Sequence, residues 1–575
     1  MRCLLAVVFL LSSFATFAEE LKLKVTDQQG AVVQQARVAV YPAQSTSPAG
    51  VKPISADGTA TFDLPAGTYR VEILAAGFGA TSVTVTVPHP ETLAATVRPA
   101  ASPETVEVSA TRTPLPTDDS ASSVGSLSSD QLIAMQPVAA SDAVRFMPGA
   151  VVNTAGRRGG LASLFVRGGD SRYNKVLVDD VAVNDPGGTF DFGVIPMDEV
   201  ERVEMVRGAV STLYGSDAMT SALTFSTRAG STLTPELRFG AEGGTFGTAR
   251  GYASLSGARG PFDYNLFGQQ FNTEGQGVND AYSNSSQGAN VGVRLSERAT
   301  FRLHIRHSNE RSGVQSFWNF NGQPLLPPDT DQRARQNNLL ASASFTIAAP
   351  SKWQHRFTGF EYHHRRLNED TFEDPGRVSP TFGPIDFPFT DFANINRAGF
   401  EYQGEYWATS WARSAFGYRF EDENGFAGDL TVPPLSHGLR RNHEVFGEQV
   451  FNWKRLSVVA GARFVHNESF GNRGVPRITT SFLVARGGNA FSGTRLRFAY
   501  GTGIKEPRLE SRSAQAASTS SPTPTSRPSR TVPWKRAFSR ASSAARCGSA
   551  PATTTTSLPI RSPSPRIRSR SLDST

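Results

Sequence analysis

The chain has 575 residues, of which 38% are hydrophobic and 10% aromatic, and this length predicts several domains. No run reaches the roughly 18 apolar residues of a membrane helix, whereas plentiful Gly and aromatic residues favour β-structure. The net charge of +7 comes from residues 511–575, which hold 10 Arg, 1 Lys and 1 Asp, so residues 1–510 carry −3. This distribution argues against nucleic acid as a partner. The two cysteines, Cys3 and Cys547, exclude a disulfide framework in the body of the chain.

Residues 1–18 have the pattern of a secretory signal peptide. Arg2 precedes an apolar core over residues 4–11, and small residues lead up to Glu19. The apolar core is too short for a membrane anchor. We therefore expect cleavage before Glu19 and export of the rest of the chain.

Residues 19–88 alternate between apolar and polar side chains, which is the period of half-buried strands. About 70 residues of this kind predict a small β-sandwich. The segment resembles the carboxypeptidase regulatory-like domain through V-T-D-Q-Q-G-A-V-V-Q-Q-A-R-V and L-P-A-G-T-Y-R-V-E-I-L-A-A-G-F. It carries no His/Glu zinc set, so we expect a spacer or docking module. The predicted strands are residues 21–26, 37–41, 56–64, 67–74 and 81–87.

A linker rich in Ala, Pro and Thr is expected over residues 89–103. Residues 104–112 then contain a short β-prone strip flanked by prolines, with no obvious partner strand in the same chain. Its main-chain N–H and C=O groups can be satisfied by adding to the edge of another protein's sheet. The strip consists of Thr105, Val106, Glu107, Val108 and Ser109.

Residues 113–230 mix helical and extended patterns. Residues 128–146 are predicted to be helical in part, with Ser141 or Asp142 as a cap. Helices mixed with short strands predict a small α+β domain of about 120 residues. The predicted strands begin at residues 151, 164, 175 and 200.

Five motifs of this domain occur in the order and spacing of one known family. They resemble the plug of TonB-dependent outer-membrane receptors, and residues 104–112 then correspond to a TonB box. The loop N-D-P-G-G-T-F-D-F-G (184–193) is most similar to cobalamin receptors. The motifs are F-V-R-G-G (165–169), V-L-V-D-D-V-A-V-N-D-P (176–186), I-P (195–196), V-E-R-V-E-M-V-R-G (200–208) and L-Y-G-S-D-A-M (213–219).

The resemblance implies two sets of functional residues. The first set is expected to make buried ion pairs and hydrogen bonds with a barrel wall, and comprises Arg167, Glu201, Arg202, Glu204 and Arg207. The second set lies in loops 153–162 and 184–193, which point outward in such plugs. These candidate substrate-binding residues are Arg157, Arg158, Asp185, Phe190, Asp191 and Phe192. Solvated strand residues and plain turn chemistry are the alternative interpretations of the two sets.

From residue 236 onward, strand-sized segments alternate as expected for an antiparallel transmembrane β-barrel, with external loops near residues 312–335 and 368–390. A plugged transporter barrel has about 22 strands. At roughly 20 residues per strand, residues 231–510 suffice for roughly 13 or 14 strands. The barrel is therefore predicted to be incomplete, although an open sheet would leave unpaired edges in lipid.

Residues 511–575 hold 17 Ser, 10 Arg, 9 Thr and 8 Pro, a composition unsuited to barrel strands. We expect a disordered, low-complexity tail that is an out-of-frame reading of a GC-rich gene. The competing interpretation is a genuine basic tail that binds RNA or membrane.

Together these patterns predict a mainly β, non-enzymatic receptor with no cofactor and no metal site. It would sit in the lipid of a Gram-negative outer membrane, with its N-terminal domain in the periplasm. The expected partners are TonB, with its inner-membrane energising complex, and a transported ligand. A ferric siderophore is the first candidate, and cobalamin, a glycan or a peptide are alternatives. A surface binding or adhesion protein without transport, and an inactive truncated product, are the other classes considered.

Overall fold

The computed structural model describes residues 18–507 and 534–542, apart from short gaps. Within the described residues, no helix is long and apolar enough to cross a membrane. The predicted signal, most of the basic tail, and the residues Thr105, Val108, Ser109 and Arg157 lie outside the described residues. The internal gaps are residues 29, 34–35, 44, 46–47, 56, 76–77, 79–80, 99–105, 108–109, 157, 315–328, 350–351, 372–377, 380–382, 385–387, 432–434, 469 and 487–490.

The N-terminal region is a sandwich of two sheets, with strand orders β4-β1-β7 and β3-β2-β5-β6. Alternate side chains of β1 point into the core, and Leu21, Leu23 and Val25 are fully buried there. The strands are β1 (Ala18–Thr26), β2 (Arg37–Pro42), β3 (Gly50–Pro53), β4 (Thr59–Pro65), β5 (Gly67–Leu74), β6 (Thr81–Val87) and β7 (Leu93–Thr96).

The prediction that residues 89–103 form a linker is wrong for β7, which is a strand of the sandwich. This strand pairs in parallel with β1, from Leu23 opposite Leu93 to Thr26 opposite Thr96. Ala95 is buried in the sandwich core. A four-residue strand rich in Ala gives no clear periodic signal, so only its pairing across the sheet reveals it.

The region that follows the sandwich is built around a five-stranded sheet of order β10-β15-β16-β13-β14. Ser128 caps α2 and accepts from the Gln131 N–H, which is a capping box visible in the sequence. The elements are β8 (Val106–Glu107), β9 (Leu115–Pro116), α1 (Thr117–Ser120), β10 (Ser123–Leu127), α2 (Ser129–Met135), α3 (Ala140–Val144), β11 (Ala150–Thr154), β12 (Ala162–Val166), the 3-10 turn η2 (Ser171–Tyr173), β13 (Asn174–Val178), β14 (Val181–Ala182), β15 (Val200–Arg207), α4 (Ser211–Tyr214) and β16 (Ser221–Thr227).

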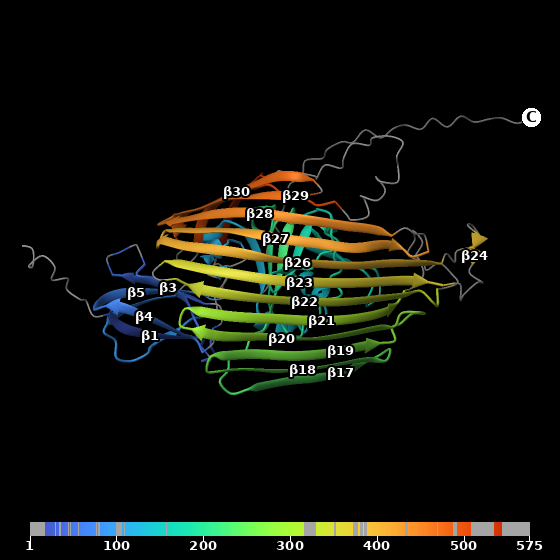
Figure 1. Ribbon diagram of the computed structural model, residues 1–575, viewed down its shortest axis with the longest axis horizontal. Coiled ribbons are helices and arrows are strands. Elements are labelled where there is room, and N and C mark those ends of the chain that lie inside the picture. The colour runs from blue at the N-terminus through green and yellow to red at the C-terminus, as the bar shows by residue number, and fades with distance from the viewer. Residues whose placement is uncertain are drawn as a thin grey trace, which may run out of the picture.

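The remaining strands form one 14-stranded antiparallel sheet, called here the barrel sheet, which curves around the plug domain (Figure 1). The predicted fold class, mainly β with a sandwich, a plug and a barrel-type sheet, is confirmed. The strands are β17 (Glu236–Gly244), β18 (Thr248–Arg259), β19 (Phe262–Thr273), β20 (Tyr282–Ser296), β21 (Ala299–Gly313), β22 (Arg333–Ala348), β23 (Trp353–Asp370), β26 (Phe389–Thr409), β27 (Ala412–Asp429), β28 (Ser436–Trp453), β29 (Leu456–Asn467), β30 (Gly471–Arg486), β31 (Phe491–Gly501) and β32 (Trp534–Ser542). A separate hairpin joins β24 (Val378–Ser379) to β25 (Gly383–Pro384).

The last strand corrects one prediction. Residues 511–575 were expected to contain no barrel strand, yet β32 pairs with β31, from Phe491 opposite Ser542 to Tyr500 opposite Trp534. Pairing along a sheet edge depends on main-chain groups, so a segment of unusual composition can still extend the sheet.

The two ends of the barrel sheet differ. At one end, strands are joined by brief connections such as residues 410–411 and 454–455. At the other end, residues 314–332 and 371–388 connect the strands. We call these the short-turn end and the long-loop end. The sandwich lies at the short-turn end, on the left in Figure 1.

Candidate functional site: the plug–barrel interface and the coupling strip

The plug is held to the barrel sheet largely through polar contacts. Arginines from the sheet donate to main-chain carbonyl oxygens of the plug over 2.6–3.1 Å. Such carbonyls carry no charge that a sequence pattern could reveal. The pairs are Arg306 with Pro196, Arg397 with Ala182, Arg413 with Pro114, Arg463 with Thr212 and Leu213, and Arg477 with Ala110.

Buried acids pair with three of these arginines, Arg397, Arg463 and Arg477, and with the neighbouring Arg440. Arg397 donates from Nε to Glu423 Oε1 over 2.6 Å, and Arg440 pairs with the other oxygen of Glu423. Arg440 also lies 3.2 Å from Glu506. All four side chains are at most 5% exposed. Pairing is essential here, because an isolated buried charge is strongly destabilising.

The first predicted set of plug residues does not supply this interface. Arg167 donates to Ser123 Oγ over 2.8 Å, and Arg207 donates to the Val124 carbonyl over 2.9 Å, both within the plug. Arg202 pairs with Glu204 on the same strand, and Glu201 is exposed. The expectation of barrel partners is therefore wrong for Arg167 and Arg207. Arg207 is on β15, which lies inside the plug sheet between β10 and β16, and Arg167 follows β12 and turns to Ser123 of β10.

The loop at residues 184–193 is fixed by its own side chains. The Asn184 Oδ1 atom accepts from the Val176 N–H over 2.7 Å, and Asp191 Oδ1 accepts from the Ala162 and Gly193 N–H groups. Phe192 is buried in the plug core. Gly188 has φ +83°, and a Cβ there would lie 2.2 Å from the Arg172 carbonyl oxygen. Asp191 therefore stabilises the backbone of the loop, and Phe192 stabilises the plug core.

Asp185 connects this loop to the barrel. Its carboxylate lies 2.7 Å from His364 Nδ1 and 3.4 Å from Arg366. Burial alone would raise the pKa of Asp185, but the charges of His364 and Arg366 and the hydrogen bond from His364 outweigh it, so the pKa is lowered. Sequence reasoning found Asp185 but not its partners, which lie about 180 positions away.

Replacing Asp185 by Asn is expected to loosen the plug by about 1.5–3 kcal/mol, the range for hydrogen bonds to charged groups. The effect would be measured as a lower unfolding temperature in detergent. Because the folded-state pKa is lowered, the stabilisation is expected above about pH 4 and should be lost as the pH falls below it.

The same substitution at Asp170 is a matched control. Asp170 is also a plug carboxylate, but its partner Arg172 is local and both side chains are 35% exposed. Hydrogen bonds from Arg172 hold the pKa of Asp170 at about 2. Exposed pairs contribute at most about 1 kcal/mol, so Asp170→Asn should change stability little. Equal effects of both substitutions would contradict a plug–barrel role for Asp185.

The other loop with candidate substrate residues, 153–162, contains Arg158, whose side chain is half-buried. Arg158 Nη1 lies 2.9 Å from Asp142 Oδ2, and its guanidinium lies 5.8 Å from the ring centroid of Phe271 on the barrel sheet. Phe190 from the neighbouring loop is also half-buried and meets Phe192 edge to face at 4.9 Å. Arg158 and Phe190 are thus partly accessible, as are Asp185 and Asp191, whose carboxylates already accept hydrogen bonds within the chain.

One acidic cluster lies at the long-loop end. The carboxylates of Asp329, Asp331 and Asp370 have oxygens within 4.8 Å of one another. Asp329 Oδ1 accepts from the Asp331 and Gln332 N–H groups, which is ordinary turn chemistry. We assign no cation to this cluster.

Residues 105–109 are called here the coupling strip. Two of its residues are paired with another segment of the same chain. Val106–Glu107 runs antiparallel to Leu115–Pro116. The expectation that the strip has no partner strand of its own is therefore wrong for these two residues. The reason is that the chain reverses at residues 110–114, where Arg112 is tightly held.

Residues 110–116, called here the anchor segment, fix the strip to the barrel sheet. Arg112 Nη1 donates to Glu401 over 2.6 Å, and its backbone N–H donates to Glu448 over 2.7 Å. Its guanidinium lies 4.3 Å from the ring centroid of Phe446. Arg413 holds the Pro114 carbonyl. The sequence did not single out Arg112, because its partners are about 290 and 340 positions away.

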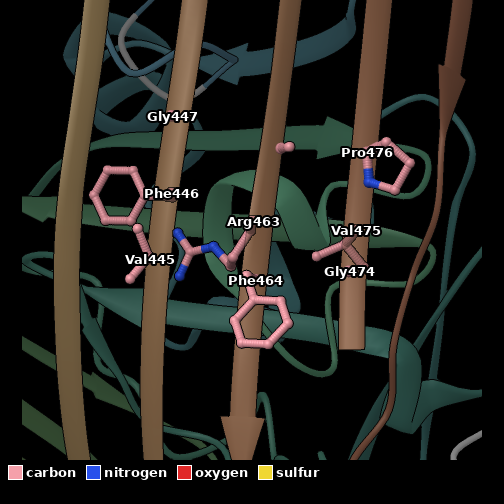
Figure 2. Close-up of a pocket in the computed structure, with 9 residues that line it drawn as sticks. Val445, Phe446, Gly447, Arg463, Phe464, Gly474, Val475 and Pro476 are labelled. Carbon is pink, nitrogen blue, oxygen red and sulfur yellow. The ribbon is translucent and has the colours of Figure 1, made fainter. Parts of the chain in front are cut away.

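A shallow apolar depression lies on the barrel sheet at β28, β29 and β30 (Figure 2). Arg463 and Phe446 are on the plug-facing side, so their strand neighbours Phe464 and Val445 point to the opposite face. Both neighbours are at least half-exposed. An apolar, outward-facing depression suits lipid contact rather than a polar nutrient.

Comparisons with known proteins follow the same division of the chain. The TonB-dependent Receptor Plug Domain model matches residues 116–222, and the Carboxypeptidase regulatory-like domain model matches residues 20–99. The Vitamin B12 transporter BtuB of Vibrio vulnificus (strain CMCP6) is 35% identical over 120 residues, which cover 21% of this chain and 20% of that protein. The BtuB of strain YJ016 is 33% identical over 117 residues. The matched region thus spans about a fifth of the length of these curated relatives.

Solved structures support the fold. The alcaligin receptor FauA from Bordetella pertussis has a TM-score of 0.55 at 14% identity, covering 70% of this chain and 66% of that one. The ferric yersiniabactin uptake receptor FyuA from Yersinia pestis has a TM-score of 0.54 at 14% identity, covering 68% and 66%.

Parts of the chain therefore match the plug domain model of TonB-dependent receptors and the carboxypeptidase regulatory-like domain model, and its fold is similar to that of solved outer-membrane receptors. The similar proteins are transporters and receptors by name, which agrees with the interpretation as a non-enzymatic protein.

Proposed function

We propose that this chain is an outer-membrane receptor that takes up a scarce nutrient with energy transmitted through TonB. The observation that carries the proposal is a plug lodged against the barrel sheet by polar contacts, with the coupling strip beside its anchor at the short-turn end. Polar contacts can be exchanged for water, so a pulled plug can rearrange.

The two ends of the barrel sheet support an orientation. Outer-membrane barrels have short periplasmic turns and longer extracellular loops. By this rule the short-turn end faces the periplasm, so the sandwich and the coupling strip would be on the side of TonB. The loops at residues 153–162 and 184–193 would then meet ligand arriving from outside.

A ferric siderophore is our first candidate ligand, since similar solved structures include the siderophore receptor PirA from Acinetobacter baumannii and the ferric yersiniabactin uptake receptor FyuA. Cobalamin is the second candidate, because the curated relatives are vitamin B12 transporters. Glycans and peptides remain further alternatives. Arg158 and Phe190 are the described plug residues that we propose for ligand contact.

The test is an accumulation assay in a Gram-negative strain that lacks its own siderophore and cobalamin receptors. Cells expressing the chain would receive radiolabelled ferric siderophores or radiolabelled cobalamin. We expect accumulation of one ligand that stops when TonB is deleted or the proton gradient is dissipated. Surface binding without accumulation would instead favour the binding or adhesion alternative.

A further inference from the structure

The sandwich is docked on the barrel sheet through a buried tryptophan. Trp407, near the end of β26, is fully buried and packs with Ala39, Tyr41, Val51 and Leu74 of the sandwich. A large aromatic side chain enclosed by another domain contributes much of the stability of an interface. The sandwich therefore has a defined seat at the short-turn end, as Figure 1 also shows.

Charged pairs surround this tryptophan. Arg37 of the sandwich donates hydrogen bonds to both carboxylate oxygens of Glu405, with 2.7 Å between Nη2 and Oε1. Arg294 lies 3.3 Å from Asp57 at another edge of the interface. The Arg37–Glu405 pair is largely buried, with side-chain exposures of 14% and 3%. Bidentate geometry of this kind fixes orientation as well as contact.

One barrel residue touches both the sandwich and the anchor segment. Arg413 donates from Nη1 to the Pro114 carbonyl over 2.9 Å and from Nη2 to Glu72 of the sandwich over 3.4 Å. Its guanidinium also lies 4.1 Å from the ring centroid of Trp407. The docked sandwich thus helps to orient the group that holds Pro114.

A second route runs through Glu405. Its Oε1 atom accepts from Arg37 and also from Gln403 Nε2, over 2.9 Å. The same Gln403 nitrogen donates to the Arg112 carbonyl over 3.0 Å. Two separate polar routes therefore join the sandwich to the carbonyl groups of Arg112 and Pro114 in the anchor segment.

We propose that the docked sandwich is a brace that holds the anchor segment, and with it the paired residues Val106–Glu107, against the barrel sheet. Undocking would separate Arg37 from Glu405 and Glu72 from Arg413. Glu405 and Arg413 would then be hydrated and less well oriented. The anchor would loosen, and the strip would become easier to extract. The biological meaning of this inference rests on the proposed coupling role of residues 105–109.

Hydrogen exchange of the full chain in detergent, read by mass spectrometry, tests the brace. Trp407→Ala should expose β3 (Gly50–Pro53), and Arg37→Met should remove one route to the anchor. In both variants we expect amide exchange over residues 110–116 to rise about fivefold to tenfold, the order set by losing one or two net hydrogen bonds. Unchanged exchange in the sandwich core would show that the domain itself stays folded.

Two control variants match these changes. Trp407→Phe keeps an aromatic ring, and the Nε1 atom of Trp407 has no hydrogen-bond partner among the described residues, so exchange should stay near wild type. Lys22→Met removes an exposed sandwich cation whose side chain is 56% exposed.

Arg37→Met with wild-type exchange over residues 110–116 would overturn the brace, and so would Trp407→Ala without increased exchange in β3. The readout involves neither ligand nor TonB, so failed uptake and a failed brace are distinguishable outcomes.

Discussion

Deleting residues 105–109 is expected to abolish energised uptake while leaving ligand binding intact. In the proposed function, the strip would supply main-chain donors and acceptors for pairing with TonB, and without it no force would reach the plug. The plug itself should stay seated, because the anchor at Arg112 and the carbonyl contacts of Arg463 lie outside the deletion. Accumulation of labelled ligand should fall to the level of cells without TonB. The dissociation constant on de-energised cells should change by less than about twofold, since no ligand contact is removed.

Deleting residues 99–103 is the matched control. It removes the same number of residues from the preceding segment and leaves the strip and its anchor in place. We expect accumulation to remain close to wild type. Uptake that survives loss of residues 105–109 would refute the coupling assignment, and loss of uptake in both deletions would point to chain length rather than to the strip.

Replacing Arg440 by Met is expected to be the most destabilising of the single substitutions considered. Arg440 is 3% exposed and pairs with Glu423 and Glu506, which are 1% and 5% exposed. Removing one partner of a buried pair costs about 3–5 kcal/mol, because the remaining charge is left uncompensated. The measurement is the midpoint of thermal or denaturant unfolding in detergent, together with protease access to the plug.

Arg441 provides a control one position away. It points to the opposite side of β28, pairs with Asp422, and is 48% exposed. Exposed pairs contribute at most about 1 kcal/mol, so Arg441→Met should leave the unfolding midpoint nearly unchanged. Similar losses from Arg440→Met and Arg441→Met would mean that the buried charge network does not hold the sheet and plug together.

Part of the candidate site was readable from the sequence and part was misread. Asp185 was found, and the structure gives it two barrel partners, His364 and Arg366. Phe192 and Asp191 are predicted to contact ligand. In the structure, Phe192 packs in the plug core and Asp191 accepts hydrogen bonds from backbone N–H groups. Aromatic and carboxylate residues in a glycine-rich loop suit both roles, and only the packing around them separates the two.

The resemblance to plugged receptors and the type of most elements are accessible from the sequence alone. The alternation of residues such as Leu21, Leu23 and Val25 specifies a strand with one buried face, because the two-residue period is a local property. The plug motifs and the approximate number of barrel strands were likewise accessible. These features depend on neighbours in the chain, which a sequence displays directly.

The pairing of charges and the contacts between domains become visible in the three-dimensional arrangement and not before. Arg112 pairs with Glu401, Arg37 pairs with Glu405, and Trp407 is enclosed by the sandwich. No local pattern encodes these partners, because many arginines and acids along the chain are chemically equivalent until the strands are placed. The register of the barrel sheet, set by main-chain pairing over hundreds of residues, brings one particular acid to each arginine.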